Sequence, residues 1–224
     1  MADFRTHAAF GAGLGVGLAV IAGALGLVSG PTLLAPVFLV AALGAMAPDI
    51  DSDSGVPFHV TFGMLSLVSA GFTFSSLSRH GALVLDAGLW ALGVAVAVFA
   101  AGGGIFKKWT KHRGMAHSIP AAVLAGLLVF FVAGRLSFGD ADAFLLGVSA
   151  TLGYLVHLVL DELYAAIDFE GKRFAPSRTL GSSLKFSSSS RVATVLVYGT
   201  IILLATRNVS RFASLARELW NRMT

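Results

Sequence analysis

Seven long apolar stretches, separated by short polar segments, restrict the fold of this chain more than any other feature. Of its 224 residues, 56% are hydrophobic and only 12% are charged, about half the charged fraction of a soluble domain. Because backbone polar groups inside a bilayer must be paired within their own segment, such stretches fold as helices. The sequence therefore predicts an all-α, polytopic transmembrane helical bundle of about six to seven spans. The stretches lie at about 7–28, 32–47, 58–78, 82–106, 118–135, 141–163 and 191–206.

Two of these stretches have compositions that suit contact with other helices. The first holds Gly11, Gly13, Gly15 and Gly17, which form two overlapping GxxxG pairs and predict close helix packing. The stretch at 58–78 is rich in serine and threonine, whose hydroxyl groups can hydrogen-bond to carbonyls of their own helix. We expect both helices to be partly buried among others.

The end of the chain differs from the spans. Apolar residues recur there at helical spacing, and four arginines lie between them, at 207, 211, 217 and 222. This pattern predicts an amphipathic helix that can lie on a membrane surface. We therefore expect a transmembrane helical domain over 1–206 and an amphipathic C-terminal helix over 207–224. The apolar set of this helix is Val209, Phe212, Leu215, Leu219 and Trp220.

Most metal-binding side chains fall in four short fragments, each at the end of an apolar stretch. If all seven stretches cross the membrane, the four fragments share one face. Most basic residues of the loops share it too, so the positive-inside rule predicts that this face is cytoplasmic. The arginines at the end of the chain would then lie on the other side. The fragments are Thr6-His7, Pro48-Asp49-Ile50-Asp51-Ser52-Asp53, His112-Arg113-Gly114-Met115-Ala116-His117, and Gly153-Tyr154-Leu155-Val156-His157 with Asp161.

Two pairs of residues, a histidine with an aspartate and a histidine with a histidine, are the strongest signals within these fragments. His157 and Asp161 are four residues apart, which places both on one helix face, where they can bind a single metal ion. An ionisable pair in an apolar segment is costly and usually functional. His112 and His117 cannot share a face of a regular helix, so we expect a bend at Gly114 to turn both rings to one point.

The remaining candidates are carboxylates and single histidines. The series Asp49, Asp51 and Asp53 does not fit a calcium loop, because glycine and glutamate are missing at the sixth and twelfth positions. We favour Asp49 and Asp51 as ligands and expect Asp53 to face solvent. His7 is a candidate because it lies at the shared face. Two other histidines matter less: we expect His59 to be a reserve ligand and His80 to be structural.

The donor set indicates the chemistry. Cysteine is absent, so the ligands must be imidazole and carboxylate, which suits zinc first, then manganese or iron, with one or two ions. Such a divalent metal makes water nucleophilic near neutral pH. We expect Asp51 to accept the proton of that water and Arg113 to stabilise negative charge developing on an oxygen of the substrate. The formal net charge of +4 is modest and relates to orientation and anionic head groups, not to nucleic acid.

The four fragments, in this order, resemble the YdjM-like family of bacterial inner-membrane, metal-dependent hydrolases over residues 6 to about 161. The resemblance implies an inner (cytoplasmic) membrane location. It also implies that the metal or catalytic positions are His7, Asp49, Asp51, His112, His117, His157 and Asp161. More distantly, the histidine–aspartate pair one helical turn apart is similar to that of zinc-dependent phospholipase C enzymes. One departure is Met115-Ala116, where the family more often has an aromatic or apolar residue and a threonine.

The leading hypothesis is therefore a membrane-embedded, metal-dependent hydrolase that cleaves a phosphoester of a phospholipid or related lipid. Two alternatives come from other classes: a metal-binding transporter, and a membrane protein with a structural metal. The ligands cluster at one face instead of the middle of the membrane, where transport sites usually lie, which argues against a transporter. The basic loop at 168–190 is either a solvated loop or a lid that contacts lipid phosphates.

Overall fold

The chain folds into two compact units, and the second is inserted in the sequence between two segments of the first. A computed structural model describes residues 2–51, 56–109, 114–168, 173–174 and 181–223. The first unit comprises Met1–Pro48 and Arg113–Thr224, and the second comprises Asp49–His112. The described residues are helical apart from turns, connecting segments and one pair of two-residue strands. The predicted all-helical fold is confirmed.

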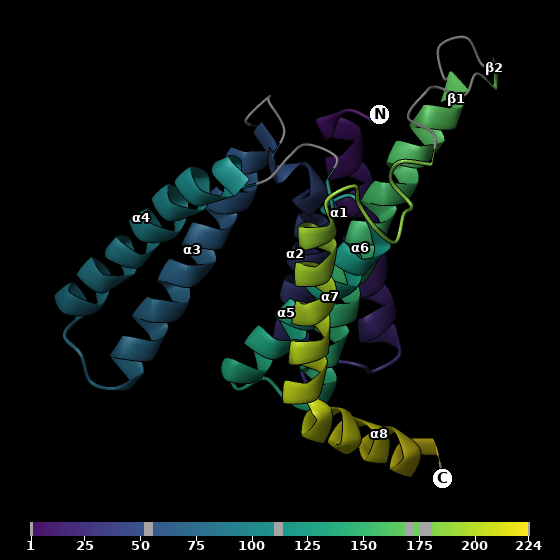
Figure 1. Cartoon of the computed structure of the whole chain (residues 1–224). Helices are drawn as coiled ribbons and strands as arrows, with labels where there is room; N and C mark the ends of the chain where they lie inside the picture. Colours follow the sequence, from purple (N-terminus) through teal and green to yellow (C-terminus); the bar gives the residue numbers. More distant parts are fainter. Residues whose placement is uncertain (1, 52–55, 110–113, 169–172, 175–180, 224) are drawn as a thin grey trace. The chain divides into compact units, whose positions relative to one another are not determined.

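In the first unit, five helices lie side by side and a sixth turns away from them at one end (Figure 1). A buried apolar core joins α2, α5 and α6 through residues such as Val37, Phe130 and Leu146. Strands β1 (Ile167–Asp168) and β2 (Arg173–Phe174) pair antiparallel after α6. These six described α-helices are α1 (Phe4–Ala24), α2 (Leu34–Gly44), α5 (Ile119–Arg135), α6 (Asp140–Ala166), α7 (Arg191–Arg207) and α8 (Val209–Met223), and a short 3₁₀ helix, η1 (Pro31–Leu33), precedes α2.

The second unit is a helical hairpin of α3 (Val56–Arg79) and α4 (Val84–Trp109). The turn between them contains Gly81 at φ +82°, a conformation that only glycine adopts without cost. As expected from the hydroxyl-rich sequence, α3 bonds back to itself: Ser66 donates to the Phe62 carbonyl at 2.7 Å and Thr73 to the Ser69 carbonyl at 2.8 Å. These bonds satisfy hydroxyl groups within an otherwise apolar helix.

All seven predicted stretches are helical, but fewer of the described helices meet the requirements of a membrane span. Two do so by length and composition, α1 and α6, and a third does if α7 and α8, bent by 59°, count together. Three further apolar helices are shorter, at Pro31–Gly44, Val84–Ala100 and Ile119–Arg135. Helix α2 alone has 11 residues, about 17 Å, roughly half the hydrocarbon thickness of a bilayer. That six to seven segments cross the membrane therefore stays a prediction.

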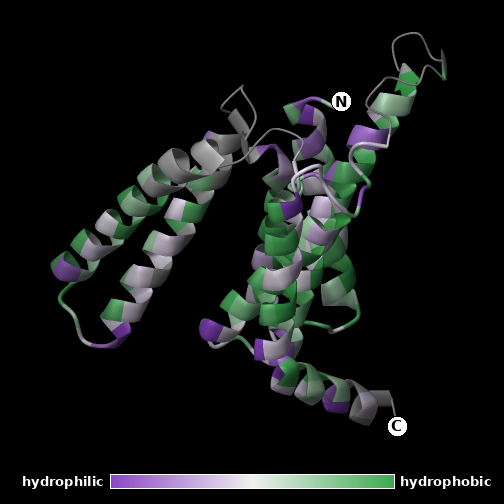
Figure 2. Ribbon diagram, in the orientation of Figure 1, coloured by the Kyte–Doolittle hydropathy of each residue, from purple (hydrophilic) through white to green (hydrophobic). Residues whose placement is uncertain are grey.

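In the first unit, hydrophobic residues predominate along the helices and the most hydrophilic residues lie mainly near the helix ends (Figure 2). Helix α7 shows this most clearly, because Val192, Val195, Leu196, Ile202 and Leu203 are all more than half exposed. Water does not favour so large an apolar surface, whereas lipid chains do. The exposed faces therefore fit a bilayer environment.

Glycines allow α1 and α2 to approach closely. A Cβ atom on Gly11 would lie 2.5 Å from the Ala45 Cβ, and one on Gly15 would lie 2.7 Å from the backbone oxygen of Phe38. In contrast, a Cβ on Gly13 or Gly17 would meet nothing within 4 Å. Of the two overlapping GxxxG pairs, only Gly11 and Gly15 therefore face the neighbouring helix.

The same principle places α6 at the centre of the first unit. A Cβ on Gly44 of α2 would lie 2.6 Å from the Ala150 oxygen of α6, and one on Gly153 of α6 would lie even closer to the Ala41 oxygen of α2. On another side, a Cβ on Gly147 would lie 2.8 Å from the Gly126 oxygen of α5. Substituting these glycines would force backbones apart, so their small size sets the helix spacing.

Helix α8 is fastened to the start of α6 by an ion pair. Arg211 donates from Nε to Asp140 Oδ1 at 2.6 Å and from Nη1 to the Phe130 oxygen at 3.0 Å, and Ser214 also donates to Asp140. The Phe212 ring stacks on Phe130 with centroids 4.9 Å apart. The predicted amphipathic helix thus has one side held against the bundle.

We predict opposite effects for two matched substitutions in α1. Gly15→Ala places a methyl group against the Phe38 backbone and should destabilise the protein by about 1–3 kcal/mol. Gly17→Ala fills open space and should be neutral or stabilising by up to about 1 kcal/mol, because alanine favours the helix. Thermal unfolding midpoints of the two purified variants in detergent measure the difference. Equal midpoints would contradict the close contact between α1 and α2.

Candidate metal centre

Helix α6 supplies two of the four side chains of the candidate centre. His157 and Asp161 lie one turn apart, as their spacing predicts, and both are buried. The His157 Nε2 atom is 3.7 Å from Asp161 Oδ2. The Nδ1–H group of His157 donates to the backbone oxygen of Ala45 at 2.8 Å. Because a carbonyl only accepts, this bond leaves the lone pair on Nε2, which faces Asp161.

His7 comes from the first turn of α1. Asp3 caps this helix by accepting from the Thr6 backbone N–H at 2.8 Å, and the His7 backbone N–H donates to the Asp3 backbone oxygen at 3.1 Å. Hydrogen bonds from the Thr6 side chain and backbone lower the pKa of Asp3, so the cap stays ionised near neutral pH. The cap therefore determines where α1 begins and hence where His7 lies.

His117 comes from the turn that precedes α5. Ser118 caps this helix: its hydroxyl accepts from the Ala121 backbone N–H at 3.3 Å and donates to the Met115 oxygen at 2.6 Å. From α6, the Tyr154 hydroxyl donates to the Ala116 oxygen at 2.5 Å. These three bonds hold the backbone on both sides of His117.

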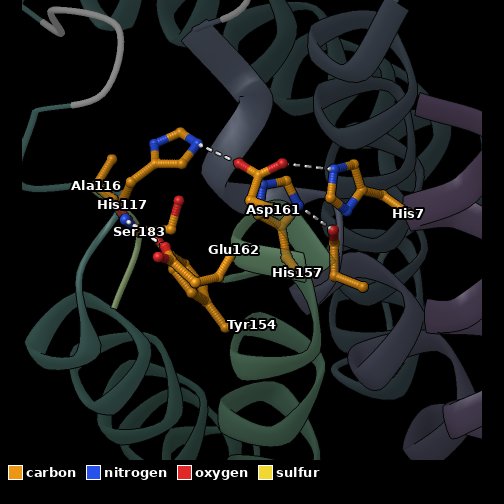
Figure 3. Close-up of polar contacts among 9 residues, drawn as sticks. His7, Ala116, His117, Tyr154, His157, Asp161, Glu162 and Ser183 are labelled. Atoms are coloured by element: carbon orange, nitrogen blue, oxygen red, sulfur yellow. Dashed lines mark hydrogen bonds and ion pairs between the residues drawn. The ribbon is translucent and has the colours of Figure 1, made fainter. Parts of the chain in front are cut away.

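The three imidazoles surround one carboxylate (Figure 3). His7 Nε2 lies 3.3 Å from Asp161 Oδ1, and His117 Nε2 lies 3.8 Å from Asp161 Oδ2. The His7 and His157 rings stack at 3.8 Å, and His117 meets His157 edge-on at 5.5 Å. None of the four residues is more than 2% exposed.

These separations fit ligands of one ion better than hydrogen bonds. Two of the three Nε2–carboxylate distances, at 3.7 and 3.8 Å, exceed a hydrogen bond. With bonds of about 2.0–2.1 Å to zinc, neighbouring tetrahedral ligand atoms lie about 3.3 Å apart. Ligand atoms of His117, His157 and Asp161 are all within 4.8 Å of one another. A divalent cation would also balance the buried carboxylate.

The other predicted site residues either belong to the second unit or lie outside the described residues. Asp49 and the backbone of Asp51 belong to η2 (Ala47–Asp51), at the start of the second unit. The Asp51 side chain lies outside the described residues, as do Asp53, His112 and Arg113. The roles predicted for these residues stay predictions.

The two lesser histidines of the second unit lie on α3 and at its end. His59 is exposed, and its ring is 6.0 Å from that of Phe99. His80 bonds through Nδ1 to the Ser76 oxygen at 2.8 Å. This bond agrees with the structural role expected for His80.

Sequence reasoning missed the groups that orient the imidazoles. Tyr154 was visible only as part of the His157 fragment, and the Ala45 oxygen leaves no sequence signal.

Glu162, next to Asp161, anchors part of the basic loop. Its carboxylate accepts from the backbone N–H groups of Gly181 and Ser183. The Ile119 N–H donates to the Lys185 oxygen at 3.0 Å. Residues 181–185 therefore form a strap beside His117, so this part of the basic loop is anchored to α5 and α6.

We predict that Tyr154→Phe weakens metal binding without preventing folding. The substitution keeps the ring but removes the bond to Ala116, and loss of such an orienting group typically costs about 10–100-fold in metal affinity. Zinc titration of the purified protein against a chelating dye measures this change.

Tyr198→Phe is the matched control, because its hydroxyl donates to the Phe186 oxygen at 3.0 Å, outside the His117 turn. The control should bind zinc as the unsubstituted protein does. Equal zinc affinity in the two variants would show that Tyr154 does not position His117.

Comparison with known proteins agrees with the membrane character of the fold. The sequence model of the YdjM inner membrane protein family matches residues 1–218, nearly the whole chain. No curated protein and no solved structure matches it. The matched range includes all four residues of the buried cluster, the whole second unit and nearly all of the first. The chain is a member of the YdjM family of inner membrane proteins.

Proposed function

We propose that this protein is a metal-dependent hydrolase of the inner membrane that cleaves a phosphoester of a phospholipid or a related lipid. The observation that carries the proposal is the buried cluster of His7, His117, His157 and Asp161 in an apolar helical bundle. Burying three imidazoles around a carboxylate is costly, which favours a functional reason for keeping them.

Each residue of the cluster has a separate task. Asp161 supplies negative charge, and the three Nε2 atoms supply neutral donors that would hold a divalent ion, zinc first. The Ala45 oxygen orients His157, and Tyr154 steadies the turn of His117. A bound ion would supply Lewis acidity, which makes water nucleophilic near neutral pH.

The surroundings of the cluster suit a lipid substrate. Phe10 follows His7 by one turn and is 55% exposed. Val159 and Leu163 lie on the outward side of α6 at the level of Asp161 and are each more than 40% exposed. Acyl chains can lie against such side chains. The strap places the backbone of Lys185 beside the start of α5, near His117. A basic residue in this position suits a phosphate group.

The sequence adds further candidates to the proposal. Asp49, Asp51 and His112 are proposed as additional ligands, which would allow a second ion, with manganese or iron as alternatives to zinc. We also propose Asp51 as the group that accepts the proton of the attacking water. Arg113 would stabilise charge that develops on the phosphoryl oxygens.

We further propose that all seven apolar segments cross the membrane and that the cluster lies at the cytoplasmic face. Along α6, Asp161 follows Asp140 by 21 residues, which is about 32 Å of helix and close to the hydrocarbon thickness of a bilayer. Arg211, at the end marked by Asp140, is paired with that carboxylate. This pairing reduces the positive charge that would otherwise oppose the proposed orientation.

Two serine substitutions test the orientation in a chain that has no cysteine. Ser187 and Ser210 are both exposed, the first in the segment before α7 and the second in α8. We predict that a membrane-impermeant maleimide, added outside spheroplasts, labels Ser210→Cys at once and labels Ser187→Cys only after lysis. The reverse pattern would show the opposite orientation, and labelling of both residues from outside would show that α7 does not cross the membrane.

The hydrolase proposal predicts release of phosphate or a phosphorylated head group from lipid. Purified protein in phosphatidylglycerol and phosphatidylethanolamine vesicles should release one of these, and a chelator should abolish the release. Asp161→Asn and His157→Gln should each reduce the rate about a hundredfold or more, since each removes a proposed ligand. Phosphorus NMR of the products measures the reaction.

His80→Gln is the control, because His80 bonds only within the end of α3 in the described structure and is not a proposed ligand. It should leave the rate unchanged. Stoichiometric zinc with no lipid turnover would favour the transporter or structural alternatives. Turnover that persists in Asp161→Asn would exclude this cluster as the site.

A further inference from the structure

Helix α8 uses one side to bind the bundle and leaves another apolar side uncovered. The side against the bundle contains Arg211, Ser214 and Leu215, of which Leu215 is only 6% exposed. The uncovered side is a row of four apolar residues spaced at helical intervals, which we call the outer stripe. Its residues, all exposed, are Val209, Ala213, Ala216 and Trp220.

The outer stripe differs from the apolar set expected from the sequence. Phe212 and Leu215 belong to that expected set, but they face the bundle: Phe212 stacks on Phe130, and Leu215 is buried. Ala213 and Ala216, by contrast, join the exposed side. Val209 and Trp220 remain 60% and 64% exposed. An exposed tryptophan side chain presents a large apolar surface with one polar N–H group.

We propose that the outer stripe lies in the head-group region of the membrane, at the end of the bundle opposite the histidine cluster, and that its partner is anionic lipid. The first support is continuity with the apolar surface of α7. Ile202 and Leu203, in the last two turns of α7, are each more than half exposed, and the chain bends by 59° between α7 and α8 (Figure 1). The bend turns α8 away from the direction of a span while its apolar side stays uncovered.

The second support is the position of α8 relative to the length of α6. The ion pair between Arg211 and Asp140 holds α8 at the start of α6, about 32 Å of helix from Asp161. This length matches the distance between the two boundaries of the hydrocarbon core. If α6 spans the membrane, α8 therefore lies at the boundary opposite the cluster.

The third support is the chemistry at the edge of the stripe. Arg217 is exposed on α8 next to Ala213 and Ala216, and Ser210 continues this polar edge. Arg207 is exposed at the end of α7, two residues before Val209. Tryptophan is enriched at membrane interfaces, and arginines near a span end reach toward phosphate groups. Cationic side chains beside an apolar stripe complement anionic lipids.

The test uses the full-length protein in vesicles and one intrinsic probe. Trp90→Phe and Trp109→Phe together leave Trp220 as the single tryptophan of the three in the chain. Phosphatidylglycerol brominated near the head group should quench Trp220 fluorescence by about half, and lipid brominated near the end of the acyl chain should quench it less, since interfacial helices lie at shallow depth. If neither brominated lipid quenches Trp220 fluorescence, the proposal is wrong.

Single cysteines then compare the two sides of α8. Ala213→Cys and Ala216→Cys, on the outer stripe, should react with an impermeant maleimide about tenfold more slowly than Ser210→Cys and Arg217→Cys on the polar edge. Equal rates would place the stripe in water. Slow labelling of the stripe without quenching by brominated lipid would indicate contact with a second copy of the chain and would also overturn the proposal.

Lipid charge is the last comparison. Arg207→Gln with Arg217→Gln should reduce the affinity for brominated phosphatidylglycerol relative to brominated phosphatidylcholine, measured by quenching, about thirtyfold, at roughly 1 kcal/mol for each charge. Unchanged selectivity would refute the choice of anionic lipid as the partner. Neither arginine belongs to the histidine cluster, so zinc binding should stay the same and serves as the folding control.

Discussion

The burial of a single carboxylate constrains most of the first unit. Asp161 is 2% exposed inside an apolar bundle, where a lone charge would be strongly destabilising. Its oxygens face three imidazoles from α1, α6 and the turn before α5, so these elements must converge. Helix caps, the Tyr154 hydroxyl and the Ala45 oxygen hold that convergence in place. Many of the hydrogen bonds at this end of the unit therefore position the groups that surround the Asp161 carboxylate.

Small residues make the convergence possible. Helices in a lipid environment gain little from apolar attraction to one another and depend on close packing instead. Gly15 lets α1 approach α2, and Gly44 and Gly153 let α2 approach α6. With bulkier residues at these positions the helices would separate, and the Ala45 oxygen would no longer reach His157. The glycines thus act on the candidate centre at a distance, through the spacing of the backbones.

Helix α6 also connects the two functional proposals for this protein. Near its end it carries Asp161 in the candidate metal centre, and at its start it carries Asp140, which binds α8 through Arg211. One rigid helix therefore separates a proposed hydrolytic site from a proposed lipid-binding helix by about the thickness of a bilayer. A lipid-bound α8 would fix the depth of α6 in the membrane, and hence the depth at which the cluster meets its substrate.

The sequence by itself determined the helical class, the positions of all seven apolar helices and the amphipathic helix, because apolar composition and helical spacing are local properties. It also indicated that His7, His117, His157 and Asp161 belong together, since each lies at the end of an apolar segment. Only the tertiary structure decided which sides of the helices meet. Gly15 faces α2 while Gly17 does not, and Phe212 faces the bundle while Ala213 does not. Those choices, like the bonds from Tyr154 and to the Ala45 oxygen, depend on contacts between segments far apart in the chain, which no local pattern encodes.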